Sequence, residues 1–262
     1  MDKVIIITGG TSGIGLETAK CLAKAGCKVY EFSRREGDYP FMHHMRVDIS
    51  DEAQVREAVG KVVTHEGHID VLINNAGFGI SGAFEFTDSA DARRLMDVNL
   101  FGMNNTIRAV LPHMRRAGKG RIVNLSSVAG PLPIPFQSWY SISKAAVNAL
   151  TMALANEVHC YGIAVCCVMP GDIKTGFTSA RHKSIVGDDA YGGRIARSVA
   201  KMEKDEQTGM NPAVAGRFIA RLALKKRVKP YNTIGIVYKG CILLSKILPG
   251  TLIRFILEKM YG

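Results

Sequence analysis

The chain has 262 residues and a mass of 28.5 kDa, and its 47% of hydrophobic and 22% of charged residues exclude a disordered or fibrous protein. The formal net charge is +11, and the excess lies in residues 175–262, which hold 16 Lys and Arg against 6 Asp and Glu. A positive electrostatic field of this kind favours anionic partners. The basic cluster at 225–227 lacks interleaved aromatic residues, so we expect no nucleic acid partner. Six cysteines without a paired pattern and a start without a signal peptide predict a cytoplasmic protein.

Short apolar runs alternate with longer amphipathic stretches along the first two thirds of the chain. The runs predict strands at residues 4–7, 28–32, 45–49, 71–73, 121–125 and 163–168. Helical periodicity falls between them, at residues 13–25, 51–65, 90–116 and 138–161. This order predicts an α/β fold with a mostly parallel sheet covered by helices on both faces, and with ligands bound beyond the carboxyl ends of the strands.

A glycine-rich turn follows the first predicted strand and opens the first predicted helix. It reads Thr8-Gly9-Gly10-Thr11-Ser12-Gly13-Ile14-Gly15. Glycine lets the backbone come close to a pyrophosphate, and the first N–H groups of a helix attract phosphate charge. The spacing differs from G-x-G-x-x-G, and a glycine-rich turn without a ligand is the alternative interpretation. We expect a dinucleotide to contact this turn, through Gly9, Thr11, Ser12, Gly13, Ile14 and Gly15.

The end of the second predicted strand bears on the choice between NAD and NADP. An enzyme selective for NAD is expected to place Asp or Glu there, on the ribose 2′-hydroxyl. Here Glu31 lies inside the strand, and the strand end carries Ser33, Arg34 and Arg35. Guanidinium groups can bind a 2′-phosphate in a fork geometry, so the sequence predicts NADP, with NAD as the weaker alternative. Two solvated arginines in a surface loop are the other interpretation.

A tyrosine and a lysine lie four residues apart on the helix predicted from residue 138. Tyr140 and Lys144 share one face, where the ammonium can stabilise the phenolate and turn a phenol of free pKa about 10 into a usable acid and base. The spacing alone arises often by chance. Ser126 and Ser127 strengthen the interpretation, because they end the fifth predicted strand, where a doubly wound fold places its active site.

Together these features resemble the classical short-chain dehydrogenase/reductase family, and within it the hydroxysteroid dehydrogenases most. The resemblance covers nearly the whole chain and rests on Thr8–Gly15, Asp48, Asn74-Asn75-Ala76-Gly77, Asn99, Ser127, Tyr140, Lys144, Pro170-Gly171 and Thr175. It implies a single-domain Rossmann fold over residues 1–262, with a doubly wound, mostly parallel seven-stranded sheet. A C-terminal helical extension at 239–262 departs from the acyl-carrier-protein reductases of the family, which usually end soon after the last strand.

The resemblance also implies roles for individual residues. Tyr140 would be the acid and base, and Ser127 would orient the substrate oxygen. Lys144 would lower the tyrosine pKa and hold the nicotinamide ribose, while Asn99 would position a water. Further cofactor contacts are implied for Asp48, Ile49, Asn75, Ala76, Gly77, Tyr140, Lys144, Pro170, Gly171, Ile173 and Thr175. We expect no metal site, because the histidine pair at 43–44 has no suitably spaced ligands and suits a strand edge.

Two segments near the C-terminus complete the predicted architecture. Glycines interrupt residues 175–211, which we expect to form a mobile substrate lid. Residues 239–262 carry two apolar stripes at helical spacing, broken by Pro249 and Gly250, and so predict two short amphipathic helices. Their stripes should be covered by the body near the substrate mouth, by a second subunit or by a membrane surface, with peripheral membrane contact as the alternative.

The substrate is predicted from the apolar residues near the active site. Residues 129–136 and Phe78, Ile80 and Phe84 would line a pocket for a bulky ketone, although packing in the core is an equally weighted alternative. The sequence thus predicts an NADP(H)-dependent oxidoreductase that interconverts a secondary alcohol and a ketone on a bulky apolar substrate. The resemblance indicates a hydroxysteroid as this substrate, with a bile acid as one candidate. The alternatives are a reductase of acylglycerone phosphate or another anionic lipid ketone, and a noncatalytic NADP-binding sensor. We expect a homodimer or homotetramer.

Overall fold

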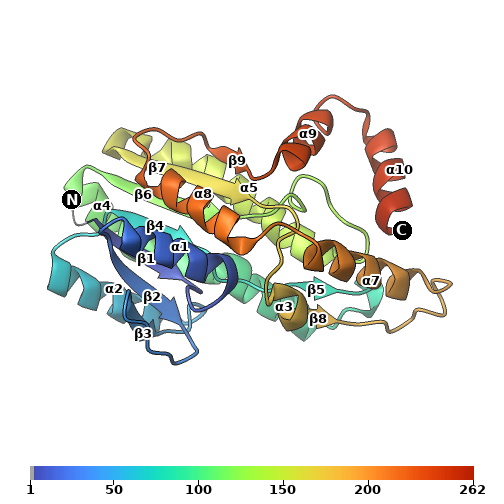
Figure 1. The fold of residues 1–262 in the computed structure, drawn as a ribbon, viewed down its shortest axis with the longest axis horizontal. Coiled ribbons are helices and arrows are strands. Elements are labelled where there is room, and N and C mark those ends of the chain that lie inside the picture. Colours follow the sequence, from blue (N-terminus) through green and yellow to red (C-terminus); the bar gives the residue numbers. More distant parts are fainter. Residues whose placement is uncertain (1–2) are drawn as a thin grey trace.

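The computed structural model describes residues 3–262, and a sheet of seven parallel strands lies at its centre (Figure 1). The order across the sheet is β3-β2-β1-β4-β6-β7-β9. The strands are β1 (Val4–Thr8), β2 (Lys28–Ser33), β3 (His43–Arg46), β4 (Val71–Asn74), β6 (Gly120–Leu125), β7 (Ile163–Met169) and β9 (Tyr231–Thr233). The direction of winding changes between β1 and β4, which opens a crevice beyond the carboxyl ends of these strands.

Helices cover both faces of this sheet. Apolar side chains of α1 and α8 share one core with the sheet, and those of α2, α4 and α5 share the other. The helices that flank the sheet are α1 (Gly13–Lys24), α2 (Glu52–Glu66), α4 (Met103–Ala117), α5 (Ser138–Val158) and α8 (Pro212–Leu224), while α3 (Ser89–Met96) contacts α5. The predicted α/β Rossmann fold with a doubly wound seven-stranded sheet is confirmed.

The first strand shows why these sequences form central strands. Val4 and Ile6 are buried in one core, and Ile5 and Ile7 are buried in the other. Burying one such side chain contributes about 1.5–3 kcal/mol, so a strand that is apolar on both faces is most stable between two layers of helices. The carboxyl end of this strand then fixes where the glycine-rich turn begins.

Two predicted elements differ from the structure. The third strand is His43–Arg46 rather than residues 45–49, because its partner β2 ends at Ser33, which pairs with Arg46. The single helix predicted at 90–116 is divided by a π-helical turn at Asp97–Gly102, which contains Asn99. Turns of this kind widen the backbone locally and often occur at functional sites.

Residues 175–211 are more regular than predicted. They contain α6 (Phe177–Ala180), β8 (His182–Lys183) and α7 (Arg194–Gln207), and β8 pairs with β5 (Ile80–Ser81) outside the main sheet. The Met210 N–H donates to the Asp172 carbonyl at 2.9 Å, beside a bridge between Ile173 and Met210. The segment therefore leaves the body of the protein and returns to it at one point. We call residues 175–211 the flap.

The predicted C-terminal helical extension is present as α9 (Ile236–Leu244) and α10 (Gly250–Tyr261), which stand out from the body (Figure 1). Tyr261 packs against α7, and Ile242 is buried. Most other large apolar side chains of the extension are exposed, namely Ile236, Val237, Leu243, Leu244, Ile247, Leu252, Phe255, Ile256 and Met260. Within residues 3–262, no helix has both the length and the hydropathy needed to cross a bilayer.

Candidate active site

The four residues expected to carry out catalysis lie at the carboxyl edge of the sheet. Tyr140 and Lys144 are on the first turns of α5, Ser127 follows β6, and Asn99 lies in the π-helical turn. The Lys144 Nζ is 5.5 Å from the centroid of the Tyr140 ring and donates to the Leu125 carbonyl at 2.9 Å. Helical spacing and the β6–α5 junction thus bring the predicted residues together.

The pKa values of this pair follow from burial. Burial raises the pKa of Tyr140, and a hydrogen bond with Ser127 and the charge of Arg181 partly offset that rise. Burial lowers the pKa of Lys144 to about 8. The phenol of Tyr140 is therefore protonated at neutral pH and can act as a proton donor.

Asn99 is fully buried and holds the loop after β4. Its Oδ1 accepts the Phe78 N–H at 3.0 Å, and its Nδ2 donates to the Phe78 carbonyl at 3.0 Å and to the Ser143 Oγ at 3.2 Å. A Cβ on Gly77 would lie 2.9 Å from the Asn99 Oδ1. The side chain of Asn99 therefore positions the backbone of Phe78 beside Lys144, and its implied role with a water stays a prediction.

The glycine-rich turn forms a cradle at the start of α1. Gly9 and Gly13 have φ values of 65° and 54°, and a Cβ on Gly15 would lie 2.2 Å from the Gly9 carbonyl oxygen. Ser12 precedes the helix but its side chain makes no cap hydrogen bond within the described chain. The first N–H groups of α1 are thus open to an anionic ligand, so the residues present fit a dinucleotide pyrophosphate.

Asn75 and Ala76 brace this cradle from β4. The Asn75 Nδ2 donates to the Gly9 carbonyl at 2.8 Å and to the Thr8 carbonyl at 3.0 Å. The Thr8 hydroxyl accepts the N–H groups of Asn75 at 3.1 Å and of Ala76 at 3.0 Å. The amide nitrogen of Asn75 is therefore used inside the protein, and that side chain shapes the nucleotide site rather than offering this nitrogen to the cofactor.

Glu31 of β2 holds the glycine-rich turn by a hydrogen bond to the backbone of Gly10, a contact that was not predicted from the sequence. Its carboxylate is fully buried, and it accepts the Gly10 N–H at 2.8 Å and the Ser33 hydroxyl at 3.1 Å. The His44 Nδ1 lies 2.6 Å from the same carboxylate. Because Glu31 is engaged in this way, it is not presented to a ribose hydroxyl.

The arginines after β2 remain accessible. The side chain of Arg34 is 61% exposed, and its Nη1 is 3.9 Å from the Asp48 carboxylate. Asp48 also accepts the Ser50 N–H at 3.0 Å and its hydroxyl at 2.6 Å. Ile49 is buried, and its carbonyl accepts the Asn105 amide at 3.0 Å. Arg34 and Asp48 thus flank the place predicted for the adenosine end.

The loop after β7 closes the other end of the predicted cofactor site. A Cβ on Gly13 would lie 3.3 Å from the Thr175 Cβ, so this loop touches the glycine-rich turn. Gly171 lies against the ring of Tyr238, from which an added Cβ would be only 2.1 Å away. Pro170 accepts the Val128 N–H at 3.0 Å through its carbonyl, next to the segment that carries Ser127.

Four further residues near the site, which form two pairs, were not predicted from the sequence. The Tyr238 hydroxyl donates to the Asp172 carboxylate at 2.6 Å, which ties α9 to the loop after β7. Arg181, which follows α6 within residues 175–211, is buried and pairs with Glu206 of α7. The contacting partners lie 66 and 25 residues apart, and no local pattern indicates either pair.

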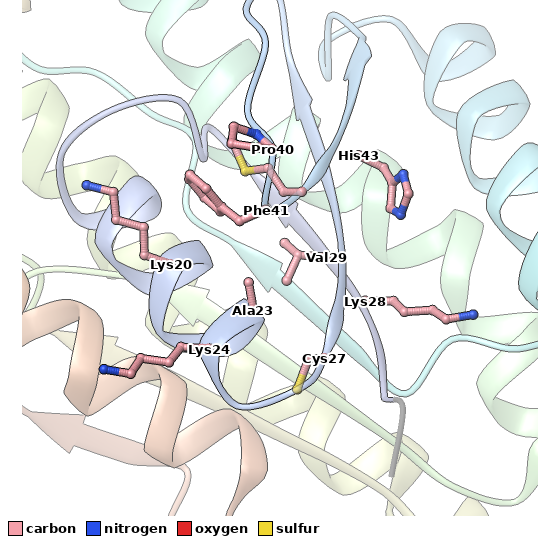
Figure 2. A pocket seen from close by; sticks show the side chains of 10 residues that line it. Lys20, Ala23, Lys24, Cys27, Lys28, Val29, Pro40, Phe41 and His43 are labelled. Carbon is pink, nitrogen blue, oxygen red and sulfur yellow. The ribbon is translucent and has the colours of Figure 1, made fainter.

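A hollow also lies elsewhere, at the amino end of β2. It measures about 650 Å³ and lies between α1 and residues 40–43. Figure 2 shows the amine ends of Lys20, Lys24 and Lys28 pointing away from its middle, where Val29 and Phe41 lie. It is thus distant from the carboxyl ends of the strands. Among residues 3–262, no three His, Cys, Asp or Glu side chains gather as a metal site.

Comparison with known proteins settles the family. Residues 3–185 match the short chain dehydrogenase family. The chain belongs to this family. A short-chain dehydrogenase is an oxidoreductase that acts on CH–OH or ketone groups, so the predicted enzyme class is confirmed.

Similar proteins extend the match over almost the whole chain. A 3-ketodihydrosphingosine reductase of Bacteroides thetaiotaomicron is 39% identical over 99% of this chain and 98% of its own. A short-chain dehydrogenase structure from Streptomyces avermitilis is 31% identical, with a TM-score of 0.84, over 99% of this chain and 96% of that one. The ElxO structure with NADP bound is 27% identical, with a TM-score of 0.76, over 92% of this chain and all of that one. These similarities support a nicotinamide cofactor.

Proposed function

We propose that this short-chain dehydrogenase reduces the ketone of a long-chain lipid to a secondary alcohol, with NADPH as the hydride donor. The observation that carries the proposal is the 39% identity, over nearly the full length of both chains, to a protein named 3-ketodihydrosphingosine reductase. That name denotes a ketone on a long alkyl chain next to a polar headgroup. It favours the lipid-ketone alternative of the sequence analysis over a hydroxysteroid.

The residues around Tyr140 suit reduction. When bound, the nicotinamide supplies a hydride to the carbonyl carbon. Tyr140 donates its phenol proton to the ketone oxygen, and Ser127 holds that oxygen by a hydrogen bond. The raised pKa of Tyr140 keeps the proton on the phenol at neutral pH, which is the protonation state that reduction requires. Lys144 holds the ribose and stabilises the phenolate that remains.

An apolar groove offers a place for the alkyl chain. It measures about 480 Å³ and lies between the segment after Ser127 and α10. Pro133 and Pro135 line one side, and Ile253 and Leu257 line the other. Each buried CH₂ group contributes about 0.8 kcal/mol, so a long chain gains much of its binding free energy in such a groove.

The residues after β2 support NADP over NAD. Arg34 is exposed, and its one ion-pair partner among residues 3–262 is the carboxylate of Asp48 at 3.9 Å, so its guanidinium can bind a 2′-phosphate, with Arg35 beside it. Glu31, the one acidic residue of β2, is turned toward Gly10 and cannot receive the ribose hydroxyls. NAD is the weaker alternative.

We also propose that the extension rests on an anionic lipid surface. Its exposed apolar side chains lie among cations, with Lys239, Lys246, Arg254 and Lys259 against a single acidic residue, Glu258. Apolar and cationic groups together are typical of helices that lie in a membrane interface. The cytoplasmic location and the homodimer or homotetramer remain predictions, as does the mobility of the flap at 175–211.

A panel of ketones tests the proposed function. Purified enzyme receives NADPH or NADH with 3-ketodihydrosphingosine, acylglycerone phosphate, an unsubstituted long-chain ketone or a ketosteroid, and cofactor absorbance is followed. We expect one of the lipid ketones to give the highest kcat/KM, and NADPH to be preferred. A ketosteroid with a higher kcat/KM than every lipid ketone would contradict the proposal.

A further inference from the structure

A buried arginine on the flap has two nitrogen donors without a partner. Arg181 follows α6, and its side chain has no exposed surface. One nitrogen, Nη2, pairs with the Glu206 carboxylate of α7, which also accepts the Thr178 hydroxyl at 2.6 Å. Among the described residues, Nε and Nη1 have no hydrogen-bond partner. Buried guanidinium donors are rarely left unsatisfied, because removing them from water is costly.

The position of these donors points to the catalytic cleft. The guanidinium carbon of Arg181 is 5.7 Å from the centroid of the Phe177 ring, and that ring is 5.7 Å from the ring of Tyr140. An added Cβ on Gly79, in the loop after β4, would lie 3.4 Å from the Arg181 Nε. The free donors therefore lie one aromatic ring away from the proposed proton donor, at the carboxyl edge of the sheet.

The surrounding charges define what the donors can bind. A guanidinium offers hydrogens only, so its ligand must supply acceptor oxygens. Glu206 neutralises part of the charge of Arg181, and Asp172 also faces it. Nearby Lys183 is paired with Glu203 on α7. A hydroxyl and a phosphate both present the acceptor oxygens that the two nitrogens lack.

We propose that Arg181 binds the oxygen-bearing headgroup of the lipid ketone through Nε and Nη1. This inference rests on the proposed function and deepens it. The headgroup is held by the flap, the ketone lies at Tyr140 and the alkyl chain runs toward the groove beside α10. Arg181 then selects ketones that carry a hydroxyl or phosphate near the carbonyl over ketones without a headgroup.

The test replaces Arg181 by lysine, which keeps a cation for Glu206 but loses the extended guanidinium. Lys183→Met is the matched control on the same flap. Kinetics compare 3-ketodihydrosphingosine, acylglycerone phosphate and an unsubstituted long-chain ketone. In Arg181→Lys we expect KM for the preferred headgroup-bearing ketone to rise about tenfold or more, and KM for the unsubstituted ketone to rise about threefold or less. In Lys183→Met we expect KM to rise about threefold or less. A rise of KM for 3-ketodihydrosphingosine identifies a hydroxyl as the group that Arg181 binds, and a rise for acylglycerone phosphate identifies a phosphate.

A binding measurement separates this inference from the proposed function. Trp139, the single tryptophan of the chain, stacks on Phe84 beside Tyr140, so its fluorescence can report ligand binding without turnover. We expect the product alcohols, dihydrosphingosine or acylglycerol phosphate, to bind Arg181→Lys about tenfold more weakly than wild type. Three results with Arg181→Lys would overturn the role of Arg181. They are an equal rise of KM for the unsubstituted ketone, a change confined to kcat, and an unchanged affinity for the product. Absence of hydride transfer together with the expected binding loss would contradict the reductase function alone.

Discussion

Replacing Lys144 by methionine should abolish ketone reduction and yet stabilise the fold at neutral pH. Lys144 is 5% exposed, and its Nζ donates to the Leu125 carbonyl at 2.9 Å. Within residues 3–262, no carboxylate forms an ion pair with it. Burial lowers its pKa from the ordinary 10.5 to about 8, so the folded protein holds a strongly desolvated ammonium at pH 7.

The size of the effect follows from that pKa. The difference between 10.5 and about 8 corresponds to about 3 kcal/mol of the free energy of unfolding at pH 7. The variant also loses the hydrogen bond to the Leu125 carbonyl, which reduces this gain in the free energy of unfolding by about 1–2 kcal/mol. The net gain of about 1–2 kcal/mol should raise the melting temperature by about 2–6 °C for a chain of this size.

The gain must depend on pH. Between pH 8 and 10.5 the unfolded chain binds more protons at Lys144 than the folded one, so wild-type stability rises with pH relative to the variant. Thermal unfolding followed by circular dichroism at pH 7 and near pH 9.5 measures the difference, with the exposed Lys24→Met as control. The gain should disappear at the higher pH. A variant that is less stable at pH 7, or a gain that is the same at both pH values, would refute the reasoning.

Three further changes test other parts of the account. Tyr140→Phe should lower kcat at least about a hundredfold and leave the Kd for NADPH unchanged, and retained turnover would remove Tyr140 as proton donor. Arg34→Ala should raise the Kd for NADPH about thirtyfold and leave NADH unaffected, whereas tighter NADH binding by wild type would contradict the phosphate role. Deleting residues 239–262 should raise KM for long-chain ketones more than for short ones and abolish sedimentation with anionic vesicles. Unchanged kinetics with lost sedimentation would leave the extension a membrane role only.

The central sheet and the positions of the residues expected to carry out catalysis were predictable because short-range patterns encode them. Residues 4–7 are apolar without alternation, which indicates a strand covered on both faces, and the glycine-rich turn follows at once. Tyr140 and Lys144 are brought together by one helical turn, and Ser127 by the end of the preceding strand. Such placements need no knowledge of distant contacts.

The remaining features depend on partners far along the chain or on small changes of helical pitch. Glu31 is 21 residues from Gly10, so its contact with the cradle follows only from the pairing of β1 with β2. The π-helical turn at Asp97–Gly102 alters the helical period too briefly to change the hydropathy pattern. Arg181 is one of many cations in the basic C-terminal third, and its burial follows only from its pairing with Glu206, 25 residues further along the chain.

The most direct test of the account is the transfer of deuterium from labelled NADPH to a lipid ketone. Wild-type enzyme is incubated with 3-ketodihydrosphingosine or acylglycerone phosphate and NADPH deuterated at the nicotinamide C4, and the product is analysed by mass spectrometry. The account predicts a secondary alcohol that carries deuterium on the carbinol carbon, formed by wild type and not by Tyr140→Phe. Lipid ketones that remain unlabelled while a ketosteroid takes up deuterium would contradict it.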